Sequence, residues 1–268
     1  MDKLSILIVQ NHAIIGNKQA NFDKIQNLLQ PFQHENIDII VLPEVWAVGW
    51  LCSKFNEQAE DENNSPTLDF LKNIATSFNS YVFGGSFVRK LDDGSLRNTC
   101  PIFNRKGNLI AKYDKMHLFT HLGADEGKYV KIGQKPVMVD IDGVKAGVSI
   151  CYDIRFCELF RAYSSNGAKI LINMAAWPLS RPHHWKHLQA ARAIENQCFM
   201  IAASQCGEII DNEYNLGHSM LISPFGDIIE ELNEKEGIIF KSINLNEVDD
   251  LRKKVPTLED KNPYGYSL

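Results

Sequence analysis

Residues Lys145–Phe156 have the sequence KAGVSICYDIRF, which predicts a strand that ends at Ile150 and a helix that follows Asp153. Cys151 would then lie at the sharp turn between the two elements. A nucleophile at such a turn is exposed at the carboxyl edge of a sheet, where the N–H of Tyr152 is available to an oxyanion. The alternative is a core cysteine packed behind the sheet, since free cysteines are among the most buried residues.

Two further strand ends carry ionisable side chains. The buried apolar strand Ile37–Leu42 is followed by a proline and Glu44, and the strand Leu109–Tyr113 is followed closely by Lys115. Taken singly, an acid or a lysine after a strand is usually a solvated surface residue. Here all three residues occur at equivalent strand ends, and in a parallel α/β sheet those ends form one cleft. Glu44, Lys115 and Cys151 are therefore predicted to meet.

These three residue types match the needs of amide cleavage. A thiol is mostly protonated at pH 7, because its ordinary pKa is about 8.5. Glu44 would take the thiol proton, and Lys115 would favour the thiolate and later the oxyanion. The sequence therefore predicts nucleophilic catalysis by Cys151.

The remaining chain alternates short apolar strands with amphipathic helices, which is the pattern of an α/β protein. Helices are predicted over Lys18–Leu29, Pro66–Phe78, Glu158–Ser165, Pro182–Asn196 and Asn246–Lys254. Strands are predicted over Leu4–Gln10, Ile37–Leu42, Tyr81–Val88, Thr99–Phe103, Leu109–Tyr113, Val137–Ile141, Ala146–Ile150, Lys169–Met174, Phe199–Ser204, Ser219–Ser223, Ile228–Leu232 and Ile238–Ile243. Two β-α-β halves with helices outside predict a four-layer α-β-β-α sandwich.

The sandwich is predicted to form a single domain over residues 1–268, because no linker rich in Pro, Gly or Ser divides the chain. Residues 255–268 form a tail with no predicted strand or helix. It is either a frayed end or an arm that packs on a partner subunit. The second interpretation is suggested by Tyr264 and Tyr266, which have nothing local to pack on.

Composition excludes several classes of protein. The formal net charge of −5 argues against nucleic acid binding, which needs a basic surface. No apolar stretch approaches the roughly 18 residues of a membrane helix. The N-terminus MDKLSILIVQNH is typical of a first strand and not of a signal peptide. We therefore expect a cytoplasmic protein whose six cysteines stay reduced.

Four segments, spread in order through nearly the whole chain, resemble motifs of the nitrilase superfamily of carbon–nitrogen hydrolases. They are VLPE at 41–44, YDKMHLF at 113–119, CYDIRFCELFR at 151–161 and HWKHLQAARAIENQCFMIAAS at 184–204. The resemblance implies an α-β-β-α sandwich, no cofactor, and dimers built sandwich to sandwich.

The resemblance also implies roles for individual residues. Glu44 would be the general base and acid, Lys115 would stabilise the tetrahedral intermediate, and Cys151 would be the nucleophile. A second family glutamate precedes the glycine of the strand that leads towards the cysteine, and Glu126 stands at the right distance to match it. Glu126 would orient Lys115 or the attacking water. The neighbouring Asp125 is the alternative if the motif is matched one residue earlier.

Within the superfamily the chain is most similar to the ω-amidase branch. The similarity lies in CYDxRF, in Trp177-Pro178 followed by Arg181, and in His184-Trp185. It implies a small ω-amide of a dicarboxylic or 2-oxo acid as substrate, such as 2-oxoglutaramate. Trp177, Arg181 and His184 would then contact the substrate.

Three other pocket residues are predicted from their positions. Arg155 would help to hold a substrate carboxylate, with an ion pair to Asp153 as the alternative. Phe119 is predicted to line the pocket, and Trp50 to shape its mouth.

Other functions are weaker interpretations of the same sequence. A deaminated-glutathione amidase or an N-carbamoyl amidohydrolase would belong to the same superfamily. A binding scaffold without catalysis is argued against by the intact Glu44, Lys115 and Cys151. No metal site is expected, because the i, i+4 histidine pairs at 183/187 and 117/121 have no acidic or cysteine partner at a suggestive spacing.

One residue departs from the family pattern. Cys157 stands where many relatives have proline. It is interpreted as an inert core thiol or as an oxidisable neighbour of Cys151.

Overall fold

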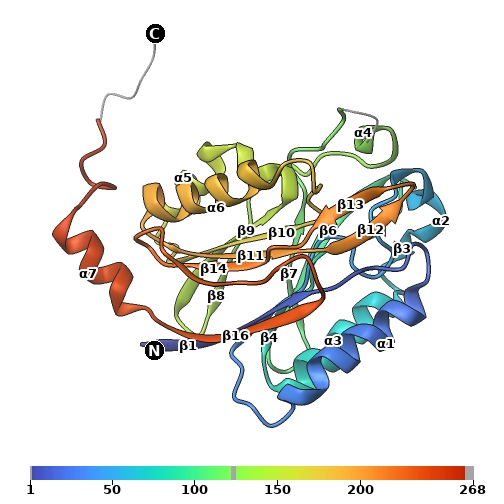
Figure 1. Cartoon of the computed structure of the whole chain (residues 1–268), viewed down its shortest axis with the longest axis horizontal. Coiled ribbons are helices and arrows are strands. Elements are labelled where there is room, and N and C mark those ends of the chain that lie inside the picture. Colours follow the sequence, from blue (N-terminus) through green and yellow to red (C-terminus); the bar gives the residue numbers. More distant parts are fainter. Residues whose placement is uncertain (1, 122–124, 263–268) are drawn as a thin grey trace.

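The computed structural model describes residues 2–121 and 125–262, and it is a four-layer α-β-β-α sandwich (Figure 1). The predicted fold is therefore confirmed. Strand β1 (Lys3–Gln10) shows how the sequence produces the layers. Its residues Leu4, Ile6 and Ile8 belong to the core cluster that includes the second sheet. Leu7 and Val9 belong to the cluster under the outer helices, because successive side chains of a strand point to opposite faces.

The first sheet lies on the side of the N-terminal helices. Its strands are β1, β2 (Ile39–Val41), β3 (Glu60–Asp61), β4 (Tyr81–Phe83), β5 (Phe87–Lys90), β6 (Leu96–Phe103), β7 (Leu109–Asp114) and β16 (Gly237–Asn244). In the described residues they follow the order β16-β1-β2-β4-β6-β5-β3, with β7 paired to β6. The strands β1, β2 and β4 are parallel, so β2 delivers Glu44 at the carboxyl edge of this parallel part.

The second sheet contains the predicted nucleophile strand. Its strands are β8 (Met138–Ile141), β9 (Val144–Ile150), β10 (Ile170–Ala175), β11 (Phe199–Ser204), β14 (Met220–Ile222) and β15 (Ile228–Glu231), in the order β15-β14-β11-β10-β9-β8. A separate hairpin is formed by β12 (Cys206–Ile210) and β13 (Glu213–Leu216). Because β9, β10 and β11 are parallel, their carboxyl ends share one edge.

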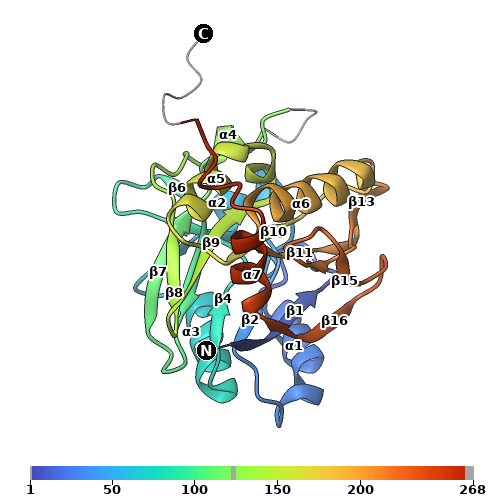
Figure 2. The same ribbon diagram turned by 90° about the vertical axis from the view of Figure 1, so that its left-hand side faces the viewer.

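Helices cover the outer faces of both sheets. They are α1 (Lys18–Leu29), α2 (Phe55–Gln58), α3 (Pro66–Phe78), α4 (Glu126–Tyr129), α5 (Cys157–Ser165), α6 (Pro182–Asn196) and α7 (Asn246–Lys254), with short 3-10 turns at Gln30–Phe32, Cys52–Lys54 and Cys151–Arg155. Figure 1 shows α1 and α3 on one side of the two sheets and α5 and α6 on the other. Helix α7 lies at the end of the sandwich that faces the viewer in Figure 2.

Local signals explain why several helices begin and end where the sequence predicts. The side chain of Asn17 caps α1, and that of Ser65 caps α3. Proline opens both α3 and α6, where its missing N–H costs nothing. Helices α3 and α6 end at left-handed residues, Asn79 and Gln197.

Some predicted elements differ from the structure. The single strand expected over Tyr81–Val88 is two strands, β4 and β5, because Gly84 and Gly85 interrupt it. The hairpin β12–β13 and the short helix α4 were not predicted. Residues 263–268, which include Tyr264 and Tyr266, lie outside the described residues. Among the described residues, no helix is both long enough and apolar enough to cross a membrane.

Candidate active site

Glu44, Lys115 and Cys151 meet between the two sheets. Glu44 follows β2 and Lys115 follows β7, both in the first sheet, whereas Cys151 follows β9 in the second sheet. The expectation that one parallel sheet supplies all three strand ends is therefore wrong. The site forms because the two stacked sheets bring these strand ends together at one end of the sandwich.

Cys151 occupies the predicted sharp turn. It directly follows β9 and begins a 3-10 helix, and its φ of 48° is unusual for a residue other than glycine. Backbone strain of this kind persists only where the surroundings enforce it. Cys151 is only 7% exposed, yet it lines a cavity.

Lys115 lies between two carboxylates. Its Nζ is 2.8 Å from Oε1 of Glu44 and 2.9 Å from Oε2 of Glu126. All three side chains are fully buried. Asn98 donates from Nδ2 to Oε1 of Glu44 and to Oε1 of Glu126, at 2.9 and 3.0 Å. Asn98 therefore links the two carboxylates around the ammonium group, a contact that sequence analysis missed.

Backbone groups complete this network. The N–H of Ala176 donates to Oε2 of Glu44 at 2.9 Å, and the N–H of Phe119 donates to Oε2 of Glu126 at 2.7 Å. The choice of Glu126 over Asp125 for this position agrees with its burial, whereas Asp125 contacts the exposed Lys128.

Burial and charge shift the pKa values of the groups at this site. Burial by itself lowers the pKa of Lys115, but Glu126 and Glu44 raise it well above its ordinary value. Burial raises the pKa of Glu126, and Lys115 opposes that shift. Burial also raises the pKa of the Cys151 thiol well above its ordinary value, and the charge of Glu44 raises it further. Lys115 acts in the opposite direction but is outweighed, so the pKa of the thiol stays above its ordinary value.

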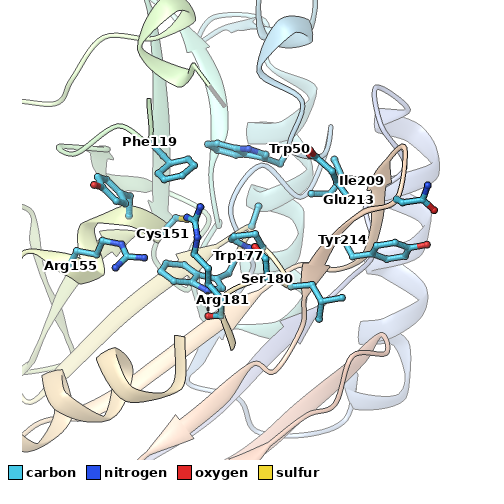
Figure 3. Close-up of a pocket in the computed structure, with 15 residues that line it drawn as sticks. Trp50, Phe119, Cys151, Arg155, Trp177, Ser180, Arg181, Ile209, Glu213 and Tyr214 are labelled. Carbon is cyan, nitrogen blue, oxygen red and sulfur yellow. Dashed lines mark hydrogen bonds between the residues drawn. The ribbon is translucent and has the colours of Figure 1, made fainter. Parts of the chain in front are cut away.

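The cavity in front of Cys151 has a volume of about 530 Å³ (Figure 3). Trp50, Phe119, Tyr152, Arg155 and Trp177 line it, as do Arg181 and residues from the hairpin β12–β13. The hairpin contributes Ile209, Asn212, Glu213 and Tyr214. No periodicity signal marked these four residues as pocket residues, because the hairpin is short and its role depends on long-range packing.

Two arginines face this cavity. The guanidinium of Arg181 lies 5.1 Å from the ring centroid of Phe119, and that of Arg155 lies 5.3 Å from the ring of Trp177. Neither has an ion-pair partner among residues 2–121 and 125–262. The predicted alternative, an ion pair of Arg155 with Asp153, is not formed. Arg155 instead contacts Nδ1 of His184 at 3.1 Å.

The remaining predicted residues take other positions. His184 is exposed and is not among the residues that line the cavity. Cys157 is exposed at the start of α5, so its interpretation as a core thiol is wrong. His117 contacts Asp153, and His187 contacts the backbone of His183. In the part of the chain that is described, no group of three or more His, Cys, Asp or Glu side chains is arranged to hold a metal ion.

Comparison with known proteins adds independent information. The profile of the carbon–nitrogen hydrolase family matches residues 7–253. The chain is 36% identical to the 2-oxoglutaramate amidase of Bacillus subtilis over 259 residues, which cover 96% of this chain and 97% of that protein. It is 30% identical to omega-amidase NIT2 of Danio rerio, with coverage of 100% and 98%. Its fold is similar to that of Saccharomyces cerevisiae Nit3, a member of the nitrilase superfamily, with a TM-score of 0.90, 27% identity and coverage of 99% and 97%.

The fold, the buried Glu-Lys-Cys arrangement and the family match lead to one conclusion. This chain belongs to the carbon–nitrogen hydrolase family of the nitrilase superfamily. It is a hydrolase that acts on amide carbon–nitrogen bonds.

Proposed function

We propose that this hydrolase is an ω-amidase, which converts the terminal amide of a small dicarboxylic or 2-oxo acid to carboxylate and ammonia. The observation that carries this proposal is the pair of arginines, Arg155 and Arg181, in the wall of the cavity that Cys151 lines. A guanidinium binds a carboxylate through charge-assisted and often bidentate hydrogen bonds. The names of the relatives, 2-oxoglutaramate amidase and omega-amidase, support the same substrate class.

In the proposed mechanism Cys151 attacks the amide carbonyl while Glu44 takes the thiol proton. The carbonyl oxygen develops negative charge against the Lys115 ammonium and the N–H of Tyr152. Glu44 then gives its proton to the leaving nitrogen, and ammonia departs. The enzyme is left as a thioester at Cys151.

Water completes the cycle. Glu44 draws a proton from the water, which attacks the thioester and releases the carboxylic acid product, and the proton returns to the thiol. Glu126 keeps Lys115 charged and in place throughout, because both of its carboxylate oxygens accept hydrogen bonds from the ammonium group that also contacts Glu44.

A longer substrate is the second candidate, and the cavity itself favours it. A volume of about 530 Å³ lies within the range of drug-sized ligand pockets and exceeds the needs of a five-carbon amide. A deaminated-glutathione amidase or an N-carbamoyl amidohydrolase would use the same catalytic residues. Its substrate would contact more of the cavity wall that the hairpin β12–β13 forms.

Ammonia release from a panel of amides tests the proposal. We expect 2-oxoglutaramate to give the highest kcat/KM, above neutral short amides, deaminated glutathione and N-carbamoyl amino acids. Cys151→Ala and Glu44→Gln should each abolish turnover while the circular dichroism spectrum stays unchanged. Steady-state hydrolysis by Cys151→Ala would disprove covalent catalysis, and a preference for the long amides would replace the ω-amidase proposal with the second candidate.

We also propose that the enzyme works in the cytoplasm as a homodimer or a larger homo-oligomer. None of the cysteines in the described residues forms a disulfide, which agrees with a reducing compartment. Exposed apolar side chains near the end of α6, among them Ile194 and Phe225, support an interface with a second copy.

A further inference from the structure

The carboxylate of Asp153 is fully buried and accepts four hydrogen bonds. Its Oδ1 accepts from the backbone N–H of His117 at 3.0 Å and contacts the His117 Nδ1 at 2.8 Å. Its Oδ2 accepts from the Tyr113 hydroxyl at 2.7 Å and from the backbone N–H of Ile150 at 2.8 Å. The main-chain carbonyl of Asp153 also accepts from the N–H of Phe156, whose ring stacks on His117.

These partners belong to the two segments that carry the catalytic groups. Tyr113 and His117 flank Lys115 by two residues on either side. Ile150 directly precedes Cys151, whose backbone is held at a positive φ. One carboxylate therefore joins the first sheet, at the segment of Lys115, to the second sheet, at the turn of Cys151.

The pattern of donors requires a carboxylate at this position. Each oxygen of Asp153 accepts from one backbone N–H, that of His117 on Oδ1 and that of Ile150 on Oδ2. A backbone N–H cannot become an acceptor. In an asparagine, whichever way its amide is turned, the NH₂ group would face one of these N–H groups and repel it.

We infer that Asp153 is a positioning residue that sets the distance between the Cys151 sulfur and the Lys115 ammonium group. This inference rests on the proposed function, in which both groups act on the same carbonyl. Loss of the carboxylate would let the two segments move apart, and misplacement by about 1 Å typically costs about 100-fold in rate. Substrate binding would change little, because Asp153 is not among the residues that line the cavity.

The test compares Asp153→Asn with Asp140→Asn. Asp140 also accepts from a backbone N–H, that of Gly143, but it lies in β8 and pairs with Lys145, at the end of β9 that is remote from Cys151. For Asp153→Asn we expect kcat to fall about 100-fold with KM changed less than threefold. We also expect alkylation of Cys151 by iodoacetamide, located by peptide mass, to slow at least tenfold. Asp140→Asn should change none of these quantities.

A milder pair of variants covers the case in which Asp153→Asn does not fold. Tyr113→Phe removes one donor from Oδ2 and leaves Ile150 in place, and we expect kcat to fall about tenfold. Tyr163→Phe is its control, because the buried Tyr163 hydroxyl donates to the carbonyl of Val148 on the same strand as Ile150. Equal kcat in the two tyrosine variants, or wild-type kcat in a folded Asp153→Asn, would overturn the inference.

The outcome is separable from that of the proposed function. If the wild-type enzyme hydrolyses no ω-amide, the substrate assignment fails. The alkylation rates of Cys151 in the same variants still decide the role of Asp153, because they need no substrate.

Discussion

Arg155 and Arg181 are the side chains whose replacement tests the substrate class most directly. A hydrogen bond to a charged group typically contributes about 1.5–3 kcal/mol. Arg181→Ala or Arg155→Ala should therefore raise KM for 2-oxoglutaramate roughly tenfold to 150-fold, and should hardly change KM for a neutral amide. The larger rise in KM is expected for Arg181→Ala. Arg155 also contacts His184, so part of its hydrogen-bonding capacity is already used within the protein.

The control for these variants is Arg97→Ala. Arg97 is likewise partly buried, but its guanidinium binds Ser95 and the carbonyl of Leu96, away from the cavity. Steady-state kinetics with both amides decide the matter. Equal losses of kcat/KM on charged and neutral amides would mean that Arg155 and Arg181 support the fold, and the ω-amidase proposal would lose its physical basis.

At the scale of elements, the turn after β4 supports the catalytic end of β2. Gly85 has a φ of +64°, and a Cβ added there would lie 1.9 Å from the carbonyl oxygen of Pro43, the residue before Glu44. This contact explains why residue 85 is a glycine. The two turns can approach only because residue 85 lacks a side chain.

Gly85→Ala should therefore destabilise the protein by about 2–4 kcal/mol, from the left-handed backbone together with the overlap. It should also lower kcat, since relief of the overlap displaces Glu44. Gly94→Ala is the matched control, because Gly94 also has a positive φ but an added Cβ meets nothing within 4 Å. Urea denaturation measures both variants, and equal destabilisation by the two would refute the contact.

For the whole molecule, buried thiols predict how stability depends on pH. Burial raises the pKa of Cys52, Cys198 and Cys206 to about 12. It also raises the pKa of Cys100 and Cys151. Above the ordinary thiol pKa of about 8.5 the unfolded chain releases these protons while the folded chain retains them, so the free energy of unfolding falls as pH rises.

At a pH one unit above the ordinary thiol pKa, each buried thiol should lower the free energy of unfolding by about 1.4 kcal/mol. Urea denaturation at pH 7.0, 8.5 and 9.5 measures the loss. The variant Cys198→Ala should make the alkaline decline smaller by about 1.4 kcal/mol at pH 9.5, whereas Cys157→Ala should leave it unchanged because Cys157 is exposed. A decline that is the same in both variants would show that buried thiols do not cause it.

An apolar patch at the end of α6 bears on the assembly. Ile194, Phe225 and Val255 are 53%, 57% and 51% exposed. The segments that carry them meet at this end of the helix, because Gly226, next to Phe225, packs beside Ile194, and Gln197 donates to the carbonyl of Val255. Exposed apolar residues that gather in this way are typical of protein–protein interfaces.

Light scattering at micromolar concentration should therefore give at least twice the mass of one chain. Ile194→Lys should lower that mass, since it places a charge within the patch. Ile132→Lys should not, although Ile132 is 58% exposed. A wild-type protein of single-chain mass would contradict the proposed homodimer.

Local patterns in the sequence determined much of this protein. Helices α1, α3 and α6 begin and end at the predicted residues, since caps, prolines and apolar spacing act within a few positions. Cys151 was recognisable as a candidate nucleophile because the end of its strand and the start of the following helix lie in one short segment. Glu44 and Lys115 were recognisable in the same way, because each closely follows a strand that its own short segment predicts. Together with Cys151, these residue types indicated amide chemistry.

Only the tertiary structure decided how these parts meet. Asn98 bridges Glu44 and Glu126, and Asp153 joins segments almost 40 residues apart, through contacts that no local pattern records. The hairpin β12–β13 becomes a cavity wall, and Cys151 reaches Glu44 from a different sheet, only because the two sheets stack. Such contacts depend on the packing of whole layers, which the spacing of residues along one strand or helix does not specify.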